Sequence, residues 1–97
     1  MDEQTVREAG QTHGDAVVRG DLRTAGSYLT KEAMGAAQEV MGSLPQPIQQ
    51  AECFAVSEAG DAFVARIRYR GETDEKVVES HWEEREGEPK IVDLRVL

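Results

Sequence analysis

A carboxylate, an imidazole and a phenol are the side chains with which this chain could perform acid–base chemistry: Glu52, His13 and Tyr69. The alternating pattern around Glu52 and Tyr69 predicts strands in which both side chains face inward. His13 lies within the apolar stripe of an N-terminal helix that would cover that inner face. A half-apolar cavity moves the pKa values of such groups toward neutrality. The three residues together would suit proton transfer without a metal.

The same side chains also have simpler interpretations. Glu52 would be satisfied by an ion pair at the mouth of the sheet, and His13 by a hydrogen bond inside the core. Tyr28 and Tyr69 would be packing groups with a hydrated hydroxyl, and Trp82 would be a core anchor. Because no spacing joins an acid to a base, Glu52 and His13 are only candidate catalytic residues, and binding is expected ahead of catalysis.

Three segments with helical periodicity must position His13. The first helix should end at Gly20, and Asp21 should cap a second one over residues 22–29. Thr30 is a good cap for a third helix, which Pro45 would end. The first segment has its apolar residues on one face: Val6, Ala9, His13, Ala16 and Val17.

The C-terminal half predicts a sheet for these helices to cover. Four alternating segments, 48–57, 62–70, 74–85 and 90–97, are separated by turn residues, which is typical of an antiparallel meander. We therefore expect an α+β fold in which three N-terminal helices pack on a curved four-stranded antiparallel meander sheet. A single domain should span residues 1–97.

Turn positions predict which side chains face the helices. A two-residue turn at 59–60 would place Phe54 opposite Ala65 and Glu52 opposite Ile67. Because side chains alternate along a strand, Phe54 and Glu52 would then both point inward.

The next two hairpins extend the same inner face. They would set Trp82 opposite Phe63 and put Ser80 on that face, and a loop at 86–88 would set Trp82 opposite Val92. The expected lining of a ligand pocket under the first helix is therefore His13, Tyr28, Phe54, Tyr69, Ser80 and Trp82.

The opposite face of the sheet should be charged and solvated. Its cations and anions would complement those of a second copy, so we expect a homodimer through this outer face. The residues concerned are Arg66, Arg68, Arg70, Glu79, His81 and Glu83.

Composition excludes several classes of partner. A net charge of −8 disfavours nucleic acid and anionic membranes, and no apolar run approaches the roughly 20 residues of a membrane span. Asp2 and Glu3 stand where a secretory signal would be basic, so the expected location is the cytoplasm. A lone Cys53 and the absence of cofactor motifs predict no metal and no cofactor.

The order of elements and two stretches, AVVRGDLRTAGSYLT at 16–30 and HWEEREGEPKIVDLRVL at 81–97, resemble the nuclear transport factor 2-like superfamily. This superfamily includes ketosteroid isomerase-like and polyketide cyclase-like (SnoaL-like) proteins with a cystatin-like fold. The chain resembles a short variant, in which Pro89 stands where an aromatic residue is usual. The resemblance implies a cone-shaped fold with an internal pocket and frequent dimerisation through the sheet, but no single function.

The expected function is therefore binding of a small apolar ligand, or interaction through the outer face of a dimer. The alternative is a metal-independent isomerase, cyclase or lyase that acts on a small apolar substrate inside the cone, with Glu52 or His13 as base.

Overall fold

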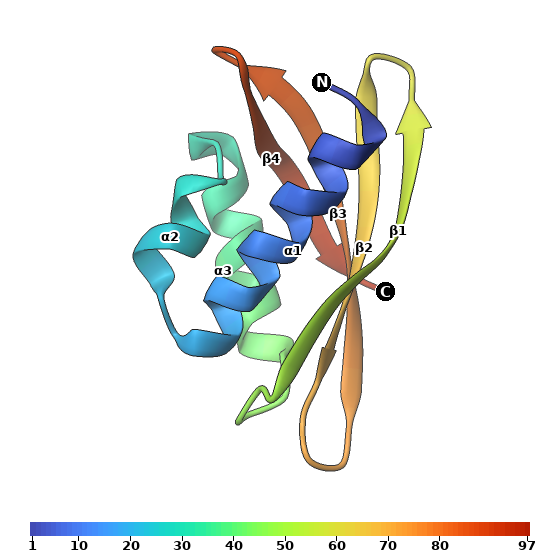
Figure 1. Ribbon diagram of the computed structural model, residues 1–97. Helices are drawn as coiled ribbons and strands as arrows, with labels where there is room; N and C mark the ends of the chain where they lie inside the picture. Colours follow the sequence, from blue (N-terminus) through green and yellow to red (C-terminus); the bar gives the residue numbers. More distant parts are fainter.

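A computed structural model describes all 97 residues and shows three helices on one face of a four-stranded sheet (Figure 1). The strands pair in the antiparallel order β1-β2-β3-β4, so the expected α+β meander is confirmed. The elements are α1 (Glu3–Arg19), α2 (Leu22–Ser27), the short 3-10 turn η1 (Lys31–Ala33), α3 (Met34–Ser43), β1 (Gln50–Ala59), β2 (Ala62–Arg70), β3 (Glu75–Arg85) and β4 (Glu88–Val96).

Helix α1 crosses the sheet over β1 and β2 (Figure 1). It starts where the Asp2 side chain accepts a hydrogen bond from the Thr5 amide at 2.8 Å, and it ends at Gly20 with a left-handed φ of 74°. Gly14 lets the helix approach the sheet closely, because a Cβ atom there would lie 3.0 Å from the Cβ atom of Ala51. This approach brings the buried face of α1, including His13, onto the inner face of the sheet.

Helix α2 is shorter than the predicted span 22–29. It ends at Ser27 because the chain then pairs with the edge of β4. The Ile91 amide donates to the Tyr28 carbonyl at 2.7 Å, and the Thr30 amide donates to the Ile91 carbonyl at 3.0 Å. This pairing covers the β4 edge and directs α3 back over the sheet.

The first hairpin departs from the predicted register. Ala59 pairs with Ala62, so the turn lies at 60–61 rather than at 59–60. A β-bulge between Cys53 and Ala55 then adds one residue to β1. An extra residue exchanges the two faces of the strand beyond it, so the predicted inward orientation of Glu52 and Phe54 is wrong.

The other hairpins largely follow the prediction. Phe63 pairs with Trp82, as expected, and Ser80 lies on the inner face. The last turn contains two residues, Glu86 and Gly87, instead of the expected three, with φ values of 56° and 79° that suit a tight hairpin. A bulge then places Trp82 opposite Ile91 instead of Val92.

Trp82 is at the centre of the core and is fully buried. Its indole Nε1 donates to the Ser80 hydroxyl at 2.8 Å, and this hydroxyl donates to the Ala65 carbonyl at 3.0 Å. A buried polar chain of this kind leaves neither group unsatisfied. The core beneath α1 is therefore filled by side chains.

None of the helices has the length and apolar character needed to cross a membrane.

Candidate functional site

A cavity of about 520 Å³ lies between the helices and the sheet. Apolar side chains make up most of its wall. Helices α1 to α3 and the segment after α2 contribute Val17, Leu22, Ala25, Leu29, Met34, Ala37, Val40 and Met41, and the sheet side contributes Tyr69, Val78 and Leu94. The volume and the apolar lining are typical of small-molecule sites.

Two exposed apolar side chains belong to this lining. Leu22 at the start of α2 is 61% exposed, and Met34 at the start of α3 is 45% exposed. Large apolar side chains that are exposed to solvent at the edge of an apolar cavity are typical of the entrance to a binding site. The opening therefore involves α2 and α3 rather than the sheet.

His13 is the imidazole of this cavity, and it comes from the buried face of α1. Its Nδ1 lies 3.0 Å from the Ala25 carbonyl oxygen, and its ring meets Tyr28 and Trp82 edge to face at centroid distances of 5.9 and 6.5 Å. Burial lowers the pKa of His13, and the hydrogen bond to Ala25 opposes this effect only in part. The imidazole is therefore neutral at pH 7.

Tyr69 provides the phenol of the cavity from strand β2. The residue is only 2% exposed, and no protein group is hydrogen-bonded to its hydroxyl. Burial raises the pKa of Tyr69, and the neighbouring Cys53 and Asp15 raise it further. The hydroxyl thus keeps its proton and remains a hydrogen-bond donor.

Glu52 and Phe54 lie outside the cavity, which corrects the prediction. The Glu52 carboxylate pairs with Arg68 at 3.3 Å on the outer face, and the same guanidinium lies 4.3 Å from the centre of the Phe54 ring. The bulge in β1 causes both placements, because it turns these side chains away from the helices. The cavity therefore contains the imidazole and the phenol but not the carboxylate.

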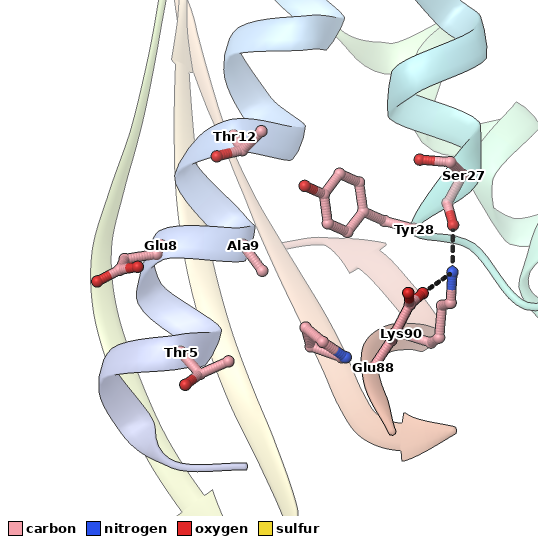
Figure 2. A pocket seen from close by; sticks show the side chains of 9 residues that line it. Thr5, Glu8, Ala9, Thr12, Ser27, Tyr28, Glu88 and Lys90 are labelled. Atoms are coloured by element: carbon pink, nitrogen blue, oxygen red, sulfur yellow. Dashed lines mark hydrogen bonds and ion pairs between the residues drawn. The ribbon is translucent and has the colours of Figure 1, made fainter. Parts of the chain in front are cut away.

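The other three residues of the expected lining are also outside this cavity. Ser80 and Trp82 are core residues that satisfy each other by a hydrogen bond. Tyr28 instead lines a second, more polar hollow of about 470 Å³ between α1 and the start of β4. Figure 2 shows its ring between Thr12 and Lys90, whose ammonium group bonds the Ser27 carbonyl at 2.7 Å.

The outer face of the sheet is charged, as expected. Glu79 lies 3.4 Å from Arg66 and 3.3 Å from both His81 and Arg95. Loss of solvent would raise the pKa of Glu79, but bonds and charges from His81, Arg95 and Arg66 outweigh this and lower the pKa. Glu79 is therefore ionised at the centre of a cationic cluster.

No group of three or more His, Cys, Asp or Glu side chains is placed to hold a metal ion. Sequence reasoning missed the contribution of the second and third helices to the cavity. The signal was the apolar stripe of the third helix, which contains Met34, Ala37, Val40, Met41 and Leu44.

The sequence matches no protein-family model and no curated protein. Solved structures that resemble this fold include two NTF2-like proteins. An NTF2-like protein of unknown function from Burkholderia xenovorans LB400 has a TM-score of 0.63 and 17% identity, and the match covers 97% of this chain and 84% of that one. An NTF2-like protein of unknown function from Shewanella baltica OS155 has a TM-score of 0.57 and 12% identity, with 97% and 86% covered. This chain therefore has the nuclear transport factor 2-like fold, as the resemblance implied.

Proposed function

We propose that the chain binds a small, mainly apolar molecule in the cavity between the three helices and the sheet. The supporting observation is the cavity itself: about 520 Å³, walled mostly by apolar groups and bordered by exposed Leu22 and Met34. An apolar ligand in a space of this size would gain packing contacts with the side chains that wall it.

Binding is better supported than acid–base catalysis. The carboxylate candidate Glu52 is on the outer face and paired with Arg68, so it does not reach a ligand in the cavity. His13 remains as the one base among the lining residues, and no Asp or Glu side chain shares the cavity with it. The Tyr69 phenol also lines the cavity, but burial raises its pKa, so it gives up its proton less readily than an ordinary acid. His13 and Tyr69 are therefore a weak acid–base pair for an isomerase, cyclase or lyase.

Filling the cavity should abolish binding of a neutral apolar probe. N-phenyl-1-naphthylamine fluoresces more strongly in apolar surroundings, so its titration reports occupancy directly. We expect saturable binding to the unmodified protein. Ala37→Phe should weaken this binding at least about tenfold, because the new ring would occupy part of the apolar space that the probe needs.

Glu39→Phe is the control, since it adds a ring at an exposed position of the same helix that does not line the cavity. Circular dichroism of both variants would establish that the fold is retained. Equal binding by Ala37→Phe and the unmodified protein would show that the probe binds elsewhere, and no saturable binding at all would contradict the proposed function.

A second proposal, which concerns assembly, is that two copies of the chain pair through the outer face of the sheet. The face carries both signs in alternation: Arg68 and Glu75 are 3.2 Å apart, and the Arg66–Glu79 pair lies alongside. A face whose own charges are mutually complementary suits a twofold interface. The half-buried Phe54 adds an apolar contact beneath Arg68.

Reversing two of these charges should dissociate the dimer. Analytical ultracentrifugation should give a dimer for the unmodified protein and a monomer for Arg66→Glu combined with Arg68→Glu, because like charges would then face each other across the interface. Arg19→Glu combined with Arg23→Glu changes the net charge equally on the helical side and should remain dimeric. A monomeric unmodified protein would refute this assembly.

A further inference from the structure

Two buried polar groups of the cavity have no hydrogen-bond partner inside the protein. His13 uses Nδ1 for the Ala25 carbonyl, and no protein atom bonds its Nε2. The Tyr69 hydroxyl is likewise without a partner, although the residue is 2% exposed. Unpartnered polar groups in a mostly apolar site are the places where a ligand acquires its orientation.

Neither atom is completely sealed from solvent, although both residues are buried. The one side-chain nitrogen or oxygen that is both sealed from solvent and without a hydrogen bond is Arg68 Nε. This atom lies 3.2 Å from a Glu75 oxygen on the outer face, at an angle unsuited to a hydrogen bond. Since His13 and Tyr69 both line the cavity, a ligand bound there would lie against both side chains.

The hydrogen-bond roles of these atoms follow from chemistry. A carbonyl oxygen only accepts, so His13 Nδ1 carries the proton and donates to Ala25. In the neutral ring Nε2 is then a pure acceptor. The Tyr69 hydroxyl keeps its proton and can donate. Besides the exposed Gln38, the polar groups that line the cavity can therefore accept one hydrogen bond from a ligand at His13 and donate one from Tyr69.

Charge gives a further restriction on the ligand. No Lys, Arg, Asp or Glu side chain lines the cavity, and His13 is neutral. A carboxylate or ammonium group inside it would lose its hydration without gaining a counter-ion, which is very unfavourable. The polar group of the ligand is therefore an uncharged one.

We propose that the ligand is an uncharged, mainly apolar molecule with a hydroxyl group that donates a hydrogen bond to His13 Nε2, while the Tyr69 hydroxyl donates to a ligand oxygen. This inference rests on the proposed binding function and adds the chemical class of the ligand. Alcohols and phenols fit this description, whereas fatty acids, amines and pure hydrocarbons do not.

Four matched naphthalene probes separate these classes. Naphthalene has no polar group, 2-methoxynaphthalene has only an acceptor, 2-naphthol has a donor and an acceptor, and 2-naphthoate is charged. Amide chemical-shift titrations should place all bound probes at the cavity. We expect 2-naphthol to bind about three- to tenfold more tightly than 2-methoxynaphthalene and at least about tenfold more tightly than 2-naphthoate.

Two variants test the two hydrogen bonds separately. His13→Asn retains an amide that can donate to the Ala25 carbonyl but lacks Nε2, so the preference for 2-naphthol over 2-methoxynaphthalene should disappear. Tyr69→Phe should weaken binding of 2-naphthol and 2-methoxynaphthalene relative to naphthalene and leave the preference for 2-naphthol intact. The ¹⁵N shift of His13 Nε2 should also move when 2-naphthol binds and stay unchanged with naphthalene, which a purely structural histidine would not show.

Failure of the ligand class and failure of the site are distinguishable. If the probes bind at the cavity but 2-methoxynaphthalene or 2-naphthoate binds as tightly as 2-naphthol, the hydroxyl assignment is overturned and the binding function survives. If none of the four probes shifts residues of the cavity, both are overturned. Loss of the 2-naphthol preference in His13→Asn alone supports the assignment.

Discussion

Replacement of Trp82 by alanine should lower the free energy of unfolding by about 3–5 kcal/mol. The side chain is fully buried, so its removal exposes a large apolar void and leaves the Ser80 hydroxyl without the indole donor. A domain of this length has a total stability of only about 5–15 kcal/mol, so the variant should be near the limit of folding. Urea denaturation followed by far-ultraviolet circular dichroism measures the change.

Trp82→Phe separates the void from the hydrogen bond. It keeps most of the ring volume but removes Nε1, so its cost should be well below that of the alanine variant. An alanine variant that loses less than about 1 kcal/mol would show that the residues around Trp82 collapse into the space, contrary to the rigid core inferred from its burial.

The second large effect is expected at Gly14 on α1. Gly14→Val should lower the free energy of unfolding by about 1–3 kcal/mol, because its Cβ would lie 3.0 Å from Ala51 Cβ and 3.3 Å from Ile67 Cγ2. Neither neighbour is the free end of a flexible side chain, so α1 would have to move away from the sheet. Thermal and urea denaturation would both report this loss.

Gly35 provides the opposite case within α3. A Cβ there would have no atom within 4 Å, so Gly35→Ala should raise the free energy of unfolding by up to about 1 kcal/mol through helix propensity alone. Changes of the same sign at Gly14 and Gly35 would contradict the claim that close helix–sheet contact, rather than helix propensity, decides the effect at Gly14.

The order and type of the elements could be predicted because they depend on local periodicity. The apolar spacing of α1 and the alternation in β2 and β3 are each contained in a few consecutive residues. The β2–β3 register also follows from sequence, since both inner faces must be apolar together. Phe63 opposite Trp82 satisfies this requirement on the inner face, and the same register places Arg66 opposite Glu79 on the outer face.

The bulge in β1 is the reason why the predicted site was partly wrong. Nothing in the alternation of Glu52 and Phe54 distinguishes an inward from an outward orientation once one extra residue is inserted after Cys53. The hydrogen bonds that hold this part of β1 come from α1. The Gln11 side chain bonds the Ala51 carbonyl and the Cys53 amide, each at 2.9 Å. Such a contact between distant segments has no local signature.

Sequence alone determined that three amphipathic helices cover a meander sheet and that His13 and Tyr69 face the space between them. Local patterns suffice for this, because each element must bury its own apolar face. Only the tertiary structure decided that Glu52 is excluded from that space and that Leu22 and Met34 border the cavity. Both outcomes depend on where separate elements meet: a helix side chain bonded to a strand edge, and two helices that leave an apolar gap above the sheet.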